Sequence, residues 1–381
     1  MADKETITYA ASGVNIELGD DASKILYNAS KATWENRKNQ LGEVIVPYDD
    51  FSGIRYINVS NLPNGTVMNL GFDGVGTKIE VAERMNNYTT IAYDLFAMVC
   101  DDAIVRGAEP VILGSVLDVN SLGKDDISHI EKLRQLAEGY INAAKTANVA
   151  VVNGELAELG ERVGGYGDFN SNWCAGLVWF ANKDRLFTGK EIEAGDYCIG
   201  LYEPGFRSNG LSLVRKTFST AYGDEWHNVD FKEKKLGDWV LTPSTIYSAC
   251  VCSMFGGFDR EPRVDLHGVS HITGGGLPGK LDRVLKPSGL GADIDSPFTP
   301  GEVLLHCQEK GNIPDKEAYR TWNMGQGMVV ITPEPKEAIK IAQEFGIEAR
   351  IIGKVTEEKG IRIKSKGFFS EGEELEYNTG K

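Results

Sequence analysis

The sequence predicts an α/β protein with two domains. Its 381 residues exceed the ~250–300 residues at which a single hydrophobic core usually stops growing. Strand-like apolar runs alternate with amphipathic helical patterns along the first half, as in α/β proteins. A charged, turn-forming segment at 182–196 separates the halves. We therefore expect one domain at 1–183 and a second at 184–381.

The first half shows helical and strand patterns in alternation. Apolar residues recur at helical spacing in three segments, 22–40, 89–106 and 125–147. Asp21 is a candidate N-cap for the first of these helices. Strands are expected at 54–59, 66–72, 111–119, 149–152 and 173–181.

The second half begins with a predicted strand at 197–202. A helix is expected to start at about Leu211, and Pro243 suits the first position of another helix. Later patterns predict two helices and a strand, at 301–311, 336–346 and 349–355.

Composition narrows the classes of function. The formal net charge of −15 argues against a nucleic acid or an anionic membrane surface as partner, because both attract basic proteins. No run approaches the ~18 apolar residues of a membrane span. The six cysteines include no C-x-x-C pair, so zinc and disulfide frameworks are not expected. These features favour a cytoplasmic protein that acts on a small molecule.

The segment that most strongly indicates chemistry is 71–78, with the sequence GFDGVGTK. A strand-like run ends at Asp73, where a carboxylate is able to hold a divalent cation. Gly74, Gly76 and Thr77 offer close backbone approach to a ligand, and Lys78 is able to meet a phosphate as a point charge. A tight turn with a solvated lysine fits the segment equally well. The order of residues matches neither a Walker A motif nor a Rossmann fingerprint.

Two further loops contain glycine beside polar side chains. The loop 205–210 reads GFRSNG and precedes the helix expected from Leu211, so it is either an anion site or an ordinary helix cap. The run 266–276 ends in three glycines, and such a costly sequence indicates close backbone approach. His267 and His271 stand four apart in a strand-like context, which does not favour a shared metal.

Six motifs in order resemble the phosphoribosylformylglycinamidine cyclo-ligase (aminoimidazole ribonucleotide synthetase) family. They extend over most of the chain and together are far more specific than one glycine loop. They are DGVGTK at 73–78, D-x₄-G-A-x-P at 102–110, NGELAE at 153–158, SNGLSLVR at 208–215, H-x₃-H-x-TGGG at 267–276 and N-x-G-x-G-M at 323–328.

The resemblance implies a fold and a reaction. Each subunit would have an N-terminal ATP-binding α/β domain and a C-terminal substrate-side domain with a ferredoxin-like core. Two N-terminal domains would pair their sheets into a barrel, giving a homodimer with ATP sites near its interface. The reaction would be ATP-driven closure of formylglycinamidine ribonucleotide to aminoimidazole ribonucleotide, with release of ADP and phosphate, in purine biosynthesis.

The resemblance also implies roles for single residues. Asp73, Asp102 and Glu155 would bind Mg²⁺, and Lys78 would contact the ATP phosphates together with the loop residues Gly74, Gly76 and Thr77. The substrate side would be formed by Arg207, Ser208, Asn209, Gly274, Gly275 and Gly276. The catalytic residues would be Lys78, Asp102 and His271, the last as a candidate for moving a proton.

One departure from the family pattern leaves an alternative open. The family has histidine before Ser-Asn-Gly, where this chain has Arg207. Arginine is a permanent cation that is able to form bidentate hydrogen bonds with a phosphate or a carboxylate. A related ATP-dependent phosphoryl-transfer enzyme with another substrate, such as a thiamine-phosphate kinase, therefore stays open. A non-catalytic nucleotide-binding paralogue is a third reading.

Overall fold

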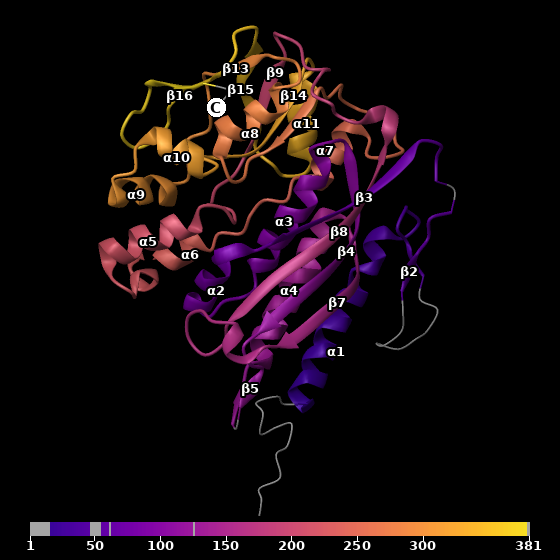
Figure 1. Ribbon diagram of the computed structural model, residues 1–381, viewed down its shortest axis with the longest axis vertical. Coiled ribbons are helices and arrows are strands. Elements are labelled where there is room, and N and C mark those ends of the chain that lie inside the picture. The colour runs from indigo at the N-terminus through magenta and orange to yellow at the C-terminus, as the bar shows by residue number, and fades with distance from the viewer. Residues whose placement is uncertain (1–15, 46–54, 61, 125, 379–381) are drawn as a thin grey trace, which may run out of the picture.

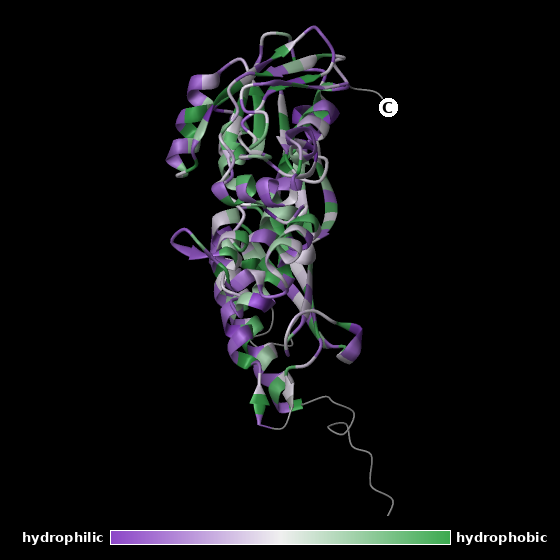
Figure 2. Ribbon diagram, turned by 90° about the vertical axis from the view of Figure 1, so that its left-hand side faces the viewer, coloured by the Kyte–Doolittle hydropathy of each residue, from purple (hydrophilic) through white to green (hydrophobic). Residues whose placement is uncertain are grey.

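The computed structural model describes residues 16–45, 55–60, 62–124 and 126–378. Two large sheets organise this part of the chain, a four-stranded sheet from the first half and a seven-stranded sheet from the second. They lie in two lobes stacked along the long axis of the molecule (Figure 1). Hydrophobic residues concentrate in the strands and on inward-facing sides of helices (Figure 2).

The four-stranded sheet has the order β3–β8–β4–β7. Its strands are β3 (Thr66–Gly74), β4 (Ala108–Val119), β7 (Ala150–Glu158) and β8 (Ser171–Asn182). β4 and β7 are parallel, and the other neighbours are antiparallel. Helix α3 (Ile91–Ile104) packs on β3, β8 and β4, and α4 (Ile130–Ala147) packs beside it. Helix α1 (Ile16–Ala32) packs on α4 and β7. This helical layer makes α3 almost entirely buried.

The opposite face of this sheet carries exposed apolar side chains. Met68 is 63% exposed and Phe72 is 76% exposed, both on β3. Leu70 on β3 and Val116 on β4 are exposed on the same face. A monomeric protein rarely leaves such a contiguous apolar face in water.

The seven-stranded sheet has the order β12–β14–β9–β15–β13–β16–β17. Its strands are β9 (Tyr197–Tyr202), β12 (Gly268–His271), β13 (Gly291–Ile294), β14 (Gln326–Thr332), β15 (Ala349–Thr356), β16 (Ile361–Lys364) and β17 (Glu374–Tyr377). The central strands β9 and β14 are apolar and largely buried, because helices cover them. Among these, α11 (Pro335–Glu344) lies against β9 and β15.

Shorter elements connect these layers. The remaining helices are α2 (Ile79–Met85), α5 (Leu211–Tyr222), α6 (Leu236–Val240), α7 (Ser248–Phe255), α8 (Gly276–Leu285), α9 (Glu302–Gly311) and α10 (Asp315–Thr321). Three two-stranded ribbons are formed by β1 (Val44–Ile45) with β2 (Tyr56–Ile57), β5 (Gly123–Lys124) with β6 (Ile127–Ser128), and β10 (Asp230–Phe231) with β11 (Lys234–Lys235). Single 3₁₀ turns include Gly76–Lys78, directly before α2.

Several predicted elements agree with the structure. Strand β9 spans the predicted 197–202, and α5 begins at the predicted Leu211. Helix α3 lies within the predicted 89–106. The predicted domain boundary stays a prediction, with β8 ending at Asn182 and β9 beginning at Tyr197.

Other boundaries were predicted wrongly. Helix α1 begins at Ile16, so Asp21 lies inside it and is no cap. Helix α4 begins at Ile130, because residues 123–124 and 127–128 pair as the β5–β6 ribbon instead. Strand β7 extends through the Asn-Gly-Glu motif at 153–155, which therefore lies within a strand and not after it.

The helix predicted from Pro243 is absent, since residues 242–247 are irregular and α7 begins at Ser248. Side chains from elsewhere in the fold bind this segment. The Thr242 carbonyl accepts a hydrogen bond from Lys78, and the Tyr247 N–H donates to Asp101. These tertiary contacts replace the intrahelical bonds that local propensity favours.

Candidate active site

Asp73 and Asp102 come together between the two lobes. Asp73 stands near the end of β3, where its Oδ1 accepts a hydrogen bond of 2.7 Å from the Gly74 N–H. Asp102 lies in the last turns of α3. Burial raises the pKa of the Asp73 carboxyl, and the nearby Asp102 charge raises it further. Two carboxylates in this relation are suited to sharing a divalent cation.

Asp102 is held by His271 at the end of β12. The distance from His271 Nδ1 to Asp102 Oδ1 is 2.8 Å, and the distance from His271 Nε2 to Arg207 Nη2 is 2.9 Å. A guanidinium only donates hydrogen bonds, so Nε2 accepts and the ring carries its proton on Nδ1. Burial lowers the pKa of His271 to about 4, and Arg207 lowers it further, against the opposing effect of Asp102. The imidazole is therefore neutral at physiological pH.

The contact with His271 also acts on Asp102. Burial alone would raise the pKa of the Asp102 carboxyl, but the His271 hydrogen bond and nearby cations outweigh burial and lower it. Asp102 is thus an ionised carboxylate with half of its side chain exposed. His271 has both ring nitrogens engaged, so in this arrangement it orients Asp102 and has no nitrogen available to take a proton.

Arg207 faces the interior of the protein and not an open substrate side. Its side chain is 1% exposed and forms ion pairs with Asp101 (3.0 Å) and Glu203 (2.7 Å). Nη1 also donates to the Thr245 carbonyl at 2.9 Å. Burial raises the pKa of Asp101 to about 7, against the lowering effect of Arg207. Protein groups therefore occupy both terminal nitrogens of Arg207, while Nε has no hydrogen-bond partner among the described residues. The placement of Arg207 on the substrate side stays a prediction.

Lys78 is also buried, with no exposed surface. Its ammonium is 2.7 Å from Asp94 and 2.5 Å from the Thr242 carbonyl. Ser244 donates a further hydrogen bond to the same Asp94 oxygen at 2.5 Å. The predicted phosphate contact by Lys78 is not present in this arrangement, because the lysine turns inward from the 3₁₀ turn and joins the two lobes.

The two predicted loops meet the turn after β3. Thr77 Oγ1 lies 3.5 Å from Ser212 Oγ, and a Cβ added at Gly76 would lie 3.9 Å from the Ser208 carbonyl. A Cβ added at Gly274 would lie 3.7 Å from Asn209 Nδ2. The segments 73–78, 207–212 and 271–280 therefore surround one site.

Polar atoms in this site have no protein partner. Ser208 Oγ and Asn209 Oδ1 are buried and form no hydrogen bond with any residue that the structure describes. Buried polar atoms are almost always paired, so these two atoms fit a polar ligand at this position.

Two of the three glycines are required by the backbone. Gly275 and Gly276 have positive φ values of +98° and +61°, a region that favours glycine. A Cβ on Gly276 would lie 1.8 Å from the Tyr319 carbonyl oxygen. This close packing places the start of α8 beside Asn209 and the two carboxylates.

Lys280, one turn into α8, is a site residue that the sequence interpretation missed. Its positive charge opposes the rise in the pKa of Asp73 and adds to the lowering of the pKa of Asp102, so it interacts electrostatically with both carboxylates. It is partly exposed and forms no ion pair within 4.0 Å with any described residue.

Glu155 does not join Asp73 and Asp102 within one chain. Residues Asp73, Ala175, Ser115 and Gly154 lie in register across the four strands, so β7 is three strands from β3. At the usual strand spacing this is roughly 14 Å. The part of the chain that the structure describes holds no cluster of three or more His, Cys, Asp or Glu side chains suited to one metal ion. Glu155 is exposed and lines a groove of about 470 Å³ on the apolar face.

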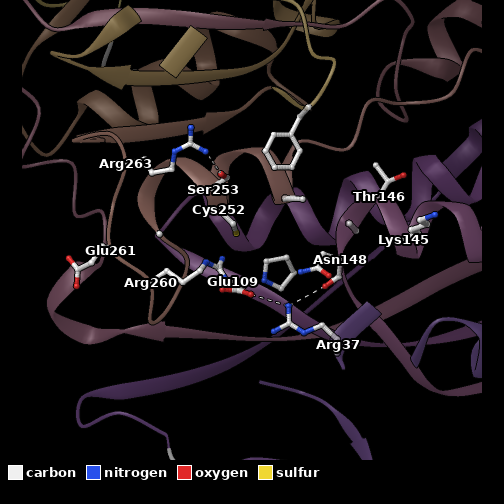
Figure 3. A pocket seen from close by; sticks show the side chains of 15 residues that line it. Arg37, Glu109, Lys145, Thr146, Asn148, Cys252, Ser253, Arg260, Glu261 and Arg263 are labelled. Carbon is white, nitrogen blue, oxygen red and sulfur yellow. Dashed lines mark hydrogen bonds and ion pairs between the residues drawn. The ribbon is translucent and has the colours of Figure 1, made fainter. Parts of the chain in front are cut away.

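A pocket of about 640 Å³ lies elsewhere, between the end of α4 and α7 (Figure 3). Although it contains several cations, acids neutralise its arginines. Glu109 binds Arg37 at 2.9 Å and Arg260 at 3.1 Å, and Arg263 lies 2.9 Å from Glu344. None of the predicted site residues lines this pocket.

Comparison with known proteins agrees with the fold and with the motifs. Family models described as AIR synthase related protein match the N-terminal domain at residues 55–171 and the C-terminal domain at 193–366. The phosphoribosylformylglycinamidine cyclo-ligase of Methanococcoides burtonii is 34% identical over 94% of this chain and 97% of its own. That of Pyrococcus horikoshii is 32% identical over 95% of this chain and 99% of its own.

Solved structures share the fold at lower identity. The hydrogenase maturation protein HypE of E. coli gives a TM-score of 0.57 at 15% identity, covering 92% of this chain and 95% of HypE. The thiamine-monophosphate kinase of Stenotrophomonas maltophilia gives 0.53 at 11% identity, covering 89% and 95%. The likeness to these proteins concerns fold, whereas the sequence identity to the cyclo-ligases extends over nearly the whole chain. The chain belongs to the phosphoribosylformylglycinamidine cyclo-ligase family.

Proposed function

We propose that this protein is the ATP-dependent cyclo-ligase that closes formylglycinamidine ribonucleotide to aminoimidazole ribonucleotide in purine biosynthesis. The observation that carries this proposal is the contact of Asp102 with His271, beside the turn after β3 where Gly76 approaches Ser208, in a chain of this family. Residues 1–183 bind ATP and form the dimer, and residues 184–381 form the substrate side.

The reaction is a phosphoryl transfer followed by ring closure. The formamide oxygen bonds to the γ-phosphorus of ATP, the bond from that phosphorus to the β,γ-bridging oxygen breaks, and ADP leaves as the amide proton is lost. An amidine nitrogen then attacks the iminophosphate carbon. The carbon–oxygen bond breaks, phosphate leaves, and the closing ring loses a proton. Positioning and charge neutralisation supply most of the catalysis in such transfers.

Asp73 and Asp102 are the proposed carboxylate ligands of Mg²⁺. Oxygen donors from one or two carboxylates, with phosphate oxygens completing the shell, are the usual protein environment of this ion. The ion would neutralise phosphate charge. A HypE structure solved in complex with ATP supports nucleotide binding by this fold.

Lys280 takes the phosphate contact first expected of Lys78. Its unpaired ammonium lies near both carboxylates, whereas Lys78 is bound by Asp94 and Thr242. Ser208 Oγ, Asn209 Oδ1 and the backbone of the Gly274–Gly276 loop would bind the ribonucleotide. This assignment explains why those buried polar atoms have no protein partner.

The active form is proposed to be a homodimer that pairs the exposed apolar face of the four-stranded sheet. The Phe72 and Met68 side chains lie on that face, and Glu155 lies beside it on the edge strand β7. Glu155 would then act near the ATP site of the second subunit. No helix in the described segments is long and apolar enough to cross a membrane. The net charge of −15 fits a small-molecule enzyme of the cytoplasm without a nucleic-acid partner.

The decisive experiment measures ADP release by the purified protein with Mg²⁺ and ATP. Release should require formylglycinamidine ribonucleotide and should yield aminoimidazole ribonucleotide in equal amount. Asp102→Asn should retain the fold and lose most of this turnover. ADP release that depends on thiamine phosphate and not on the ribonucleotide would instead show that the protein is a thiamine-phosphate kinase.

A further inference from the structure

We propose that Arg207 is a positioning residue that sets the tautomer of His271 and, through it, the orientation of Asp102. The relevant chain of contacts is continuous. Arg207 Nη2 lies 2.9 Å from His271 Nε2, and His271 Nδ1 lies 2.8 Å from Asp102 Oδ1. Arg207 itself lies outside the first layer of residues around the proposed ligands.

The direction of each hydrogen bond follows from the chemistry of the groups. A guanidinium has five N–H donors and no acceptor, so it requires a lone pair on Nε2. A neutral imidazole then has its single N–H at Nδ1, where it donates to the Asp102 carboxylate. Hydrogen-bonded partners of this kind orient metal-binding carboxylates and histidines in many proteins.

Three oxygen acceptors hold the terminal nitrogens of Arg207. Asp101 binds Nη2 at 3.0 Å, Glu203 binds Nη1 at 2.7 Å, and the Thr245 carbonyl accepts from Nη1 at 2.9 Å. The guanidinium also lies 5.2 Å from the centre of the Tyr247 ring. The backbone has a φ of +60°, uncommon for a residue with a side chain. Groups from α3, β12 and the 242–247 segment thus converge on one arginine.

Lysine at this position provides a discriminating variant. Arg207→Lys keeps a positive charge between Asp101 and Glu203 but cannot reach all four partners with one ammonium. Nitrogen-15 correlation spectra of the imidazole rings distinguish the two neutral tautomers directly. The wild-type protein should show His271 protonated on Nδ1, and Arg207→Lys should show a mixture of tautomers.

Two controls separate positioning from a general loss of structure. Arg37 is equally buried and pairs with Glu109 at 2.9 Å, remote from His271, so Arg37→Lys also removes one buried guanidinium. It should leave the His271 spectrum unchanged. His267, which lies 2.7 Å from Asp196, serves as an internal reference that neither substitution should alter.

The kinetic effect rests on the proposed function. Replacement of a residue that orients a metal ligand usually lowers metal affinity or activity by about 10- to 100-fold. Arg207→Lys should lower kcat by that factor with a smaller change in KM for the ribonucleotide, and Arg37→Lys should not lower it. Protonation of His271 on Nε2 in the wild-type protein would overturn the proposal, as would an unchanged spectrum in Arg207→Lys. Absence of wild-type turnover would contradict the proposed function alone, because the spectra still test the tautomer.

Discussion

At the residue scale, two lysines near the site differ in role because one is buried and the other is partly exposed. Lys78 ends the 73–78 motif and Lys280 lies just beyond the 267–276 motif, yet Lys78 is enclosed by Asp94 and Thr242 while Lys280 forms no ion pair with a described residue. Burial of an unpaired charge costs so much that the enclosed lysine requires its carboxylate partner. The partly exposed lysine is the one available to a ligand.

Replacement of Lys280 tests its assignment to phosphate. Lys280→Met should lower kcat/KM for ATP by about 10- to 100-fold, because a hydrogen bond to a charged group contributes roughly 1.5–3 kcal/mol. Lys280→Arg should recover part of the loss. Lys286→Met removes an exposed lysine just after α8 and should have little effect. Equal kinetics in both methionine variants would rule out the assignment.

Replacement of Lys78 should reveal a structural role. Lys78→Met leaves the Asp94 carboxylate buried without its cation, which typically costs about 3–5 kcal/mol of unfolding free energy. The measurement is urea denaturation followed by circular dichroism. Lys78→Met combined with Asp94→Leu should recover much of the loss. A Lys78→Met protein of wild-type stability that no longer binds ATP would show that the lysine serves the nucleotide after all.

At the element scale, the site depends on where α8 begins. The helix starts at Gly276 because Gly275 and Gly276 adopt positive φ and because no Cβ at Gly276 fits against Tyr319. The start of the helix determines where Lys280 lies, one turn later. A local sequence of three glycines thereby controls the position of a charged group.

Two glycine substitutions in α8 should have opposite effects. Gly276→Ala should lower the unfolding free energy by at least about 1–2 kcal/mol from the positive φ alone, and the contact with the Tyr319 carbonyl adds to this. Gly279→Ala has open space around its new methyl group and should stabilise the helix by about 0.5–1 kcal/mol. Thermal denaturation compares the two. A neutral Gly276→Ala would mean that α8 tolerates a displaced start.

The elements also show what the sequence was able to predict. Periodicity identified α3, β9 and the start of α5, because their patterns reflect burial on a defined face. It failed at Pro243, where Lys78, Asp101 and Arg207 bind the backbone from distant parts of the chain. Motifs likewise identified the segments of the site, but the inward turn of a side chain depends on such tertiary partners.

At the scale of the whole molecule, the apolar face of the four-stranded sheet carries the most exposed large apolar side chains that the structure describes. Phe72 and Met68 are its most exposed members. Its groove of about 470 Å³ reaches Glu155, the predicted metal ligand that one chain keeps apart from Asp73. Pairing of two such faces would bury the apolar residues and would bring strand β7 of each subunit, with its Glu155, to the sheet of the other subunit.

Charges on this face should separate the subunits. Met68→Glu combined with Phe72→Glu should convert a dimer into a monomer, because each buried glutamate would lose its hydration without a partner. Light scattering after size-exclusion chromatography measures the mass. Phe369→Glu, at a residue 46% exposed on the C-terminal lobe, is the matched control and should stay dimeric. A wild-type protein that is monomeric at micromolar concentration would contradict the proposed assembly.

The position of β3 at the edge of its sheet has a consequence for synthesis of the chain. β3 pairs only with β8 in this sheet, and Gly74 lies in register with Cys174, one hundred residues later. The strand that carries Asp73 therefore emerges from the ribosome long before its partner exists. Pairing at such separation is slow and leaves an apolar strand uncovered meanwhile. We expect the carboxylate pair to assemble only after β8 is complete, so nascent chains truncated before Ser171 should depend on chaperones.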